Sequence, residues 1–99
     1  MRILALRTLR QHWQRPGRGD SQQPLRAWHK LVEQADWAGP AAVKTQIGSA
    51  SVIAGNRVVF NVAGNKYRLV VKINYPYRVV YVRFIGTHAE YDAIDAAAI

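Results

Sequence analysis

The sequence predicts an α+β fold: one domain over residues 1–99, in which N-terminal helices pack on a small, mainly antiparallel sheet and a short C-terminal helix follows. Three observations lead to this class. Two apolar stripes with helical spacing lie near the start of the chain. Apolar, β-branched runs separated by turn residues fill the second half. A helix-start pattern follows the last of these runs.

Both stripes predict amphipathic helices. The first stripe consists of Leu6, Leu9 and Trp13. It predicts a helix over residues 6–14, and the following RPGRGDSQQP predicts a loop through its Pro and Gly residues. The second stripe consists of Leu25, Trp28, Val32 and Ala35. It predicts a helix over roughly residues 22–37, which Gly39-Pro40 ends. All three Trp residues are expected to pack in the core.

The rest of the chain predicts strands. AAVKTQIGSASVIAGN is expected to contain a helical turn near Pro40–Lys44 and a first strand near Ser51–Ile53. RVVFNV, KYRLVVKINY and RVVYVRFIG then predict three strands. Gly64 and Asn65 tolerate positive φ and predict a tight turn between the first two. The expected result is an antiparallel meander of at least three strands.

Charged residues interrupt the last two apolar runs. One face of KYRLVVKINY carries Tyr67, Leu69, Val71 and Ile73, and the other carries Arg68, Val70 and Lys72. One face of RVVYVRFIG carries Val80, Val82 and Phe84, and the other carries Val79, Tyr81, Arg83 and Ile85. One face of each strand is expected to pack against the helices. If the register brings the charged faces together, the sheet presents a basic, aromatic-lined surface with Arg68, Lys72, Tyr81 and Arg83.

The end of the chain adds polar residues to this surface. Thr87 and Glu90 match a capping box and predict a helix from His88 to about Ala97. His88, Tyr91, Asp92 and Asp95 would share one face of that helix. Because the helix follows the last strand directly, His88 is expected near the end of that strand. Asn61 and Asn65 lie around the hairpin turn, so the sequence predicts a shallow polar cleft here.

The net charge of the chain indicates which classes of molecule it could bind. Lys and Arg number 14 against 6 Asp and Glu, which gives a formal net charge of +8. Such a field suits nucleic acid, an acidic protein or an anionic membrane, and the alternative is a solubilising surface. The chain has no Cys, which excludes disulfides and thiolate chemistry and suits the cytoplasm. No signal peptide, membrane span or metal-ligand spacing is predicted.

The predicted cleft suits metal-free cleavage of RNA. Attack by a 2′-hydroxyl on the adjacent phosphate needs a proton acceptor, a cation for the phosphorane and an acid for the leaving 5′-oxygen. Arg gives bidentate phosphate contacts, His can act as acid or base, and Tyr can stack a base or orient a proton transfer.

Each residue also has a structural interpretation. Arg68 and Lys72 could belong to the solvated face of an ordinary sheet. Arg83 could form an ion pair with Asp92 or Glu90. His88 could be merely exposed, Tyr91 could belong to the core, and Asn61 and Asn65 could serve the turn.

Two long blocks resemble a known family. RVVFNVAGNKYRLVVKINYPYRVVYVRFIGTHAEYD, and also PLRAWHKLVEQADW, resemble the HigB-type toxins of bacterial type II toxin–antitoxin systems, within the RelE-like superfamily. The resemblance implies a RelE-like fold and an mRNA interferase, without a cofactor, that cuts mRNA on the translating ribosome. It also implies a helix-turn-helix antitoxin and a toxin–antitoxin complex that binds operator DNA.

The resemblance also implies roles for individual residues. Arg68 and Arg83 would hold the phosphate, His88 would transfer the proton, and Tyr91 would orient or stack the substrate. The residues expected to contact RNA around them are Asn61, Asn65, Lys66, Lys72 and Tyr81. Two other hypotheses stay open: a non-catalytic RNA- or ribosome-binding module, and a protein-interaction domain whose basic face meets an acidic partner.

Overall fold

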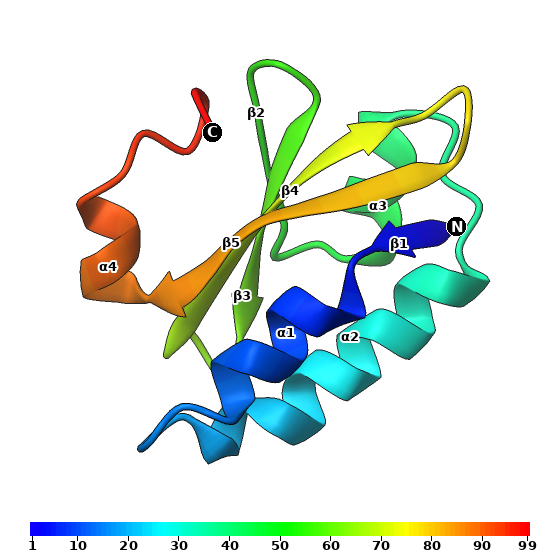
Figure 1. Ribbon diagram of the computed structural model, residues 1–99. Coiled ribbons are helices and arrows are strands. Elements are labelled where there is room, and N and C mark those ends of the chain that lie inside the picture. Colours follow the sequence, from blue (N-terminus) through cyan, green and yellow to red (C-terminus); the bar gives the residue numbers. More distant parts are fainter.

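A computed structural model describes residues 1–99, and its elements follow each other through the chain as Figure 1 shows. The helical elements are α1 (Leu6–Trp13), the 3-10 turn η1 (Gly19–Ser21), α2 (Gln22–Gln34), α3 (Pro40–Gln46) and α4 (His88–Asp92). The strands are β1 (Arg2–Leu4), β2 (Ser51–Ile53), β3 (Arg57–Val62), β4 (Tyr67–Asn74) and β5 (Val79–Thr87). The predicted α+β class, with a mainly antiparallel sheet and a short C-terminal helix, is confirmed.

The five strands form one sheet in the order β1-β5-β4-β3-β2. Strands β2 to β5 make the predicted antiparallel meander, whereas β1 lies parallel to β5 and pairs Ile3 with Val80. The sequence analysis missed β1. Three residues are too few to show a period, and this strand exists because a partner far along the chain offers it a free edge.

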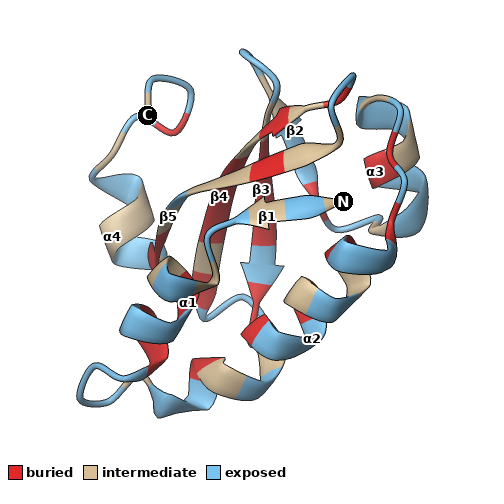
Figure 2. Cartoon of the chain, turned by 45° about the vertical axis from the view of Figure 1, so that its right-hand side comes forward, coloured by how far each residue is buried: buried red, intermediate tan, exposed pale blue.

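The main core lies between the sheet and the first three helices. It includes all three Trp residues, as predicted, with Phe60, Tyr67 and Leu69 from the sheet. Trp37 is only 2% exposed and stacks on Phe60 with 6.2 Å between ring centres. Figure 2 shows buried residues along β3 and β4 and exposed residues on the outer side of α1 and α2. One face of the sheet is therefore covered by the helices.

The opposite face of the sheet, called here the open face, has a smaller cluster of its own. Val59, Val70 and Ala96 are buried there, with Phe84 and Tyr91 packed against them. The segment after α4 runs back over this cluster, and Figure 1 shows α4 and the C-terminus on the side of the sheet away from α1 and α2.

Strand β5 contains an irregularity, and the side chains after it face the opposite sides of the sheet from those predicted. Val71 pairs with Val82 but Val70 pairs with Phe84, so Arg83 is an extra residue in a β-bulge. The alternation therefore slips by one position after Val82. Phe84 packs on the open face, and Ile85 belongs to the main core, so the prediction was wrong for both.

Two helices end earlier than predicted. Helix α2 stops at Gln34 because Ala35 takes an extended conformation (φ −76°, ψ 158°) and both Ala35 and Trp37 turn into the core. Helix α4 stops at Asp92, not Ala97, since Ala96 packs on the open face instead. Asp95 is thus not on a helical face with His88.

Candidate functional site

The open face has two polar ends separated by the apolar cluster. The first, called the turn end, lies beside the β3–β4 turn and the start of α4; it contains Asn61, Asn65, Arg68, His88 and Tyr91. The second, called the pocket end, lies toward the β4–β5 hairpin; it contains Lys72, Asn74, Tyr81 and Arg83. Arg68, Lys72 and Tyr81 therefore share one face, as predicted, but they do not converge on one cleft.

Arg68 occupies the centre of the turn end. It pairs with Asn61 on β3 and with Gly86 on β5, so these three residues form a row across the sheet. Its guanidinium donates to the carbonyl oxygen of Asn65 at 2.9 Å. No acidic side chain contacts it, which leaves most of the N–H fork free for a phosphate.

The turn beside Arg68 places three consecutive residues at positive φ. Ala63, Gly64 and Asn65 have φ of 54°, 59° and 79°. Gly and Asn adopt this region at low cost, which is why this short turn can return the chain directly into β4. The turn thereby places the Asn65 carbonyl where Arg68 can reach it.

Helix α4 places His88 at the same end. The capping box is complete: the Thr87 hydroxyl accepts from the Glu90 amide at 3.2 Å, and a Glu90 carboxylate oxygen accepts from the Thr87 amide at 2.8 Å. Gly86 pairs with Arg68 and Thr87 with Tyr67, so His88 lies two positions beyond the row of Arg68. The His88 ring is exposed, and its Nε2 lies 3.4 Å from Asp92 Oδ1.

Gly86 lets α4 fold over the sheet. A Cβ atom on Gly86 would lie 2.7 Å from the Phe84 ring and 2.8 Å from Glu90 Oε1. Both distances are far below van der Waals contact, so any larger residue here would displace the Phe84 ring and the Glu90 carboxylate that completes the capping box. Tyr91, one residue further, is half-buried and packs on Val59 and Val70. Its ring thus anchors α4 to the open face as well as standing near His88.

A polar network that the sequence analysis missed connects α4 to the helical layer. Arg18, in the loop before η1, donates to Glu90 Oε1 at 2.8 Å. The same guanidinium lies 3.3 Å from His12 Nε2, and His12 Nδ1 lies 2.9 Å from the hydroxyl of Ser21. Both His12 and Ser21 are buried. A sequence signal existed, because His12 adjoins an apolar stripe, but its partners lie in a loop without periodicity.

This network shifts two pKa values. The hydrogen bond from Arg18, then the Thr87 amide, lowers the pKa of Glu90 from 4.5 to about 2. Burial, then the charge of Arg18, lowers the pKa of His12 below 6.5, so this imidazole is neutral at pH 7. The network therefore holds α4 mainly by the close Arg18–Glu90 contact, which a neutral, buried histidine supports.

Lys66 points away from the open face. Its ammonium pairs with Asp20 of η1, which also accepts from the Tyr67 hydroxyl at 2.6 Å. The hydrogen bond to Asp20 raises the pKa of Lys66, and the same bond lowers the pKa of Asp20. The structure thus places Lys66 on the helical side, apart from Arg68.

The pocket end contains a cavity of about 370 Å³. Its lining residues are Asn56, Lys72, Ile73, Asn74, Tyr75, Pro76, Tyr81 and Arg83. Lys72 pairs across the strands with Tyr81. Arg83, two positions after Tyr81 on β5, lies at the same place, with its guanidinium carbon 5.6 Å from the centre of the Tyr81 ring. Arg83 forms no ion pair with Asp92 or Glu90.

No acidic side chain forms an ion pair with Arg68, Lys72 or Arg83. Four of the six carboxylates pair with other cations: Asp20 with Lys66, Asp36 with Arg78, Asp92 with His88, and Glu90 with Arg15 and Arg18. None pairs with Arg68, Lys72 or Arg83. These three cations therefore have no counter-charge within the protein, and an anionic ligand would supply one.

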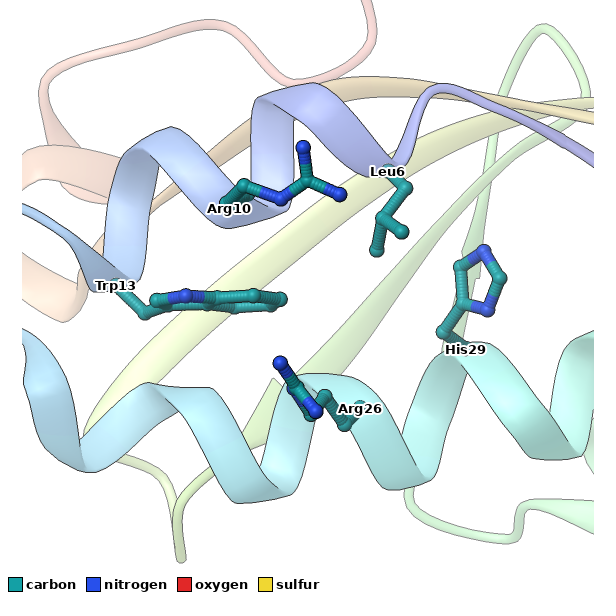
Figure 3. A pocket seen from close by; sticks show the side chains of 5 residues that line it. All are labelled: Leu6, Arg10, Trp13, Arg26 and His29. Atoms are coloured by element: carbon teal, nitrogen blue, oxygen red, sulfur yellow. The ribbon is translucent and has the colours of Figure 1, made fainter.

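A second basic cavity of about 250 Å³ lies on the helical layer, between α1 and α2. Figure 3 shows its lining: Leu6, Arg10, Trp13, Arg26 and His29. The guanidinium carbon of Arg26 lies 5.4 Å from the centre of the Trp13 ring. This cavity is outside the open face, and sequence periodicity gave no indication of it.

No helix is long and apolar enough to span a membrane. Nowhere in the chain do three or more His, Asp or Glu side chains come together in a way that could hold a metal ion.

Comparison with known families gives one match. A family model described as the RelE-like toxic component of a toxin–antitoxin system, the HigB toxin family, matches residues 21–94. The match contains every residue of the turn end and the pocket end. Comparison with curated proteins gives no significant match.

Proposed function

Because the chain belongs to the HigB toxin family of RelE-like toxin–antitoxin components, we propose that it is an endoribonuclease that cuts mRNA at the turn end. The observation that carries this proposal is the guanidinium of Arg68, which has no acidic partner and lies at the same end of the sheet as the exposed imidazole of His88. A cation and a titratable group at one end of a basic sheet suit phosphodiester chemistry.

The proposed reaction is a metal-free transesterification. His88 accepts the proton of a ribose 2′-hydroxyl, and the 2′-oxygen attacks the adjacent phosphorus. The bond to the 5′-oxygen breaks, and that oxygen takes up a proton from the protonated imidazole or from water. The products are a 2′,3′-cyclic phosphate and a 5′-hydroxyl. Asp92, 3.4 Å from His88 Nε2, would orient the ring.

Arg68 stabilises the phosphorane in this reaction, since its N–H fork matches two phosphate oxygens. Tyr91 orients or stacks the nucleotide beside the cut. Asn61 and Asn65 contact RNA at the turn, and Lys72, Tyr81 and Arg83 hold the strand further along the open face. Lys66 can contact RNA only if the RNA displaces Asp20 from the Lys66 ammonium.

Expression in cells tests the proposal. Wild type and Arg68→Ala would be expressed from a tightly repressed promoter, and transcript 5′ ends would be mapped. We expect growth arrest and new 5′ ends within coding regions for wild type only. Growth arrest without new ends would contradict nuclease activity, and full toxicity of Arg68→Ala would contradict the assignment of the site.

A component of a toxin–antitoxin system has an antitoxin as its partner. We propose that this partner carries a helix-turn-helix domain, that the complex binds operator DNA, and that cutting takes place on translating ribosomes in the cytoplasm. A neighbouring helix-turn-helix gene whose co-expression restores growth would support the first point. Cutting of ribosome-free RNA at an equal rate would contradict ribosome dependence.

The helical-layer cavity favours a second candidate function, a binding module for an acidic protein. Arg10, Arg26 and His29 converge there over an apolar floor, and none of them has an acidic partner. A docking role predicts that Arg10→Ala weakens binding of the antitoxin while purified toxin still cuts RNA. Equal antitoxin affinity in wild type and variant would remove this candidate.

A further inference from the structure

We propose that the pocket end is a base-reading subsite, which holds a nucleobase of the RNA away from the bond that is cut. This inference rests on the proposed function and adds to it the origin of sequence preference. The cavity volume of about 370 Å³ falls at the small end of the range of about 300–1,000 Å³ that ligand pockets occupy. A single nucleotide is a ligand of this scale.

The floor of the cavity offers a stacking surface. Tyr81 is half-buried on β5, so its ring is fixed by the sheet while part of it stays accessible. The Arg83 guanidinium lies 5.6 Å from the ring centre, within range of a cation–π contact. Every base has a π face that can stack on a tyrosine or an arginine plane, so this pair can hold a base without yet selecting one.

The side-chain amides of Asn56 and Asn74 supply the groups that can distinguish one base from another. Asn74 Oδ1 accepts from the Tyr77 amide at 3.2 Å, and this contact leaves the Asn74 NH₂ group free to donate. The Asn56 side chain makes no hydrogen bond within the protein, while its carbonyl accepts from the Ile73 amide at 2.9 Å. Asn amides read donor and acceptor patterns on base edges. The cavity therefore combines stacking with edge recognition.

Cations at the mouth of the cavity would hold the adjoining phosphates. Lys72 faces Tyr81 across the strands, and Arg83 covers the ring, and neither has an acidic partner. A stacked base thus lies between two free positive charges. Arg83 lies two positions after Tyr81 on β5, so strand alternation puts both on one face, and the bulge at Arg83 changes the faces only of the residues that follow it.

The subsite is separate from the proposed cutting site. Lys72 lies four positions after Arg68 on the same strand, about 13 Å at about 3.3 Å per residue. Val70, buried under Ala96, lies between them. A base in the cavity is therefore not one of the two that flank the cut, and the preference it creates falls at a fixed distance from the cut.

Cut-site sequencing on a random-sequence RNA pool tests this inference. We expect wild type to prefer one base at a fixed position that does not adjoin the cut. Tyr81→Ala should lose this preference and cut preferred sites about tenfold more slowly, and Tyr81→Phe should retain it. Tyr77→Ala is the matched control, because Tyr77 is 78% exposed in the neighbouring turn and does not line the cavity. An unchanged preference in Tyr81→Ala would overturn the inference.

Binding to a 2′-O-methyl RNA, which has no free 2′-hydroxyl, separates failure of the subsite from failure of the nuclease. At low salt Tyr81→Ala and Arg83→Gln should bind about tenfold and several-fold more weakly than wild type, with Tyr77→Ala unchanged. Equal affinity of all four proteins would overturn the subsite even if wild type cuts RNA. The expected loss of affinity would support it even if no RNA is cut. Arg83 is exposed, so Arg83→Gln keeps the test valid if Tyr81→Ala does not fold.

Discussion

The two ends of the open face carry similar cations but are built in different ways. At the turn end, a capping box and the Arg18–Glu90 contact hold α4, and with it His88, over the sheet, while Arg68 on β4 donates to the Asn65 carbonyl of the adjoining turn. At the pocket end, a cavity lies beside the β4–β5 hairpin, and its lining includes Lys72, Tyr81 and Arg83. Catalytic groups that are held in place, such as Arg68 and His88, suit the cleavage reaction. A cavity suits recognition of part of the RNA. The predictions below test this division.

The largest effect should come from Arg68. Arg68→Ala should lower the single-turnover rate of RNA cleavage by about 10³–10⁵-fold, the range for arginines that stabilise phosphoryl transition states. Arg68→Lys should recover only part of the rate, because an ammonium cannot make the bidentate contact. The control is Lys30→Ala, which removes an exposed charge from α2. A loss of less than about tenfold in Arg68→Ala would move the chemistry elsewhere.

His88 should have the next largest effect. General acid–base catalysis contributes about 10²–10⁴-fold, so His88→Ala should lower the rate by that amount. The pH–rate profile of the variant should also lose the limb that an imidazole produces, while its affinity for uncut RNA stays near that of wild type. A variant with a lower rate but an unchanged profile would assign His88 a structural role only.

Glu90 should affect stability more than chemistry. Glu90→Gln keeps a side chain that can complete the capping box but removes the charge that Arg18 contacts, and should cost about 1 kcal/mol. Glu90→Ala removes both contacts and should cost about 1–2 kcal/mol. Denaturant unfolding would measure both values. Equal stability of the two variants would mean that the capping box contributes nothing.

Acid should weaken the same contact. The pKa of Glu90 is about 2 in the folded protein against 4.5 in its absence, so its contribution to stability is complete above pH 4.5 and is lost as pH falls toward 2. His12 acts at higher pH, because its lowered pKa makes folding less favourable once pH falls below about 6.5. Melting temperatures of wild type and Glu90→Gln should therefore converge at low pH, and a constant difference down to pH 2 would contradict this.

Lys72 should have the smallest effect. Lys72→Ala should weaken RNA binding and lower the slope of log affinity against log salt by about 1, the change expected when one phosphate contact is lost. His29→Ala, on the helical layer, is the comparison. Equal slopes for wild type and Lys72→Ala would show that the pocket end does not contact phosphates.

The sequence predicted most of the fold because helical and strand periods were clear. The β3 strand, the β3–β4 turn and the capping box of α4 were correct from residue types alone. The sequence could not show the bulge at Arg83, since one inserted residue leaves no mark on local composition. It also could not show Glu90 held by Arg18, because 72 positions separate them.

The positions of the candidate site residues were likewise predicted only in part. Arg68, His88 and Tyr91 were expected near each other and lie at one end of the sheet. Lys66 was expected beside them, but it lies in the turn before β4, where its ammonium pairs with Asp20 of η1 on the helical side. Arg83 was expected at the phosphate with Arg68, but its guanidinium lies against Tyr81 at the other end of the open face.

The most direct test of the division between the two ends is the single-turnover cleavage rate at saturating protein concentration, with Arg68→Ala and Lys72→Ala side by side. Saturation removes differences in binding and leaves the chemical step. We predict that Lys72→Ala then cuts at nearly the wild-type rate, while Arg68→Ala remains slower by about 10³-fold or more. Recovery of Arg68→Ala at saturation, or an equal residual defect in Lys72→Ala, would contradict the account.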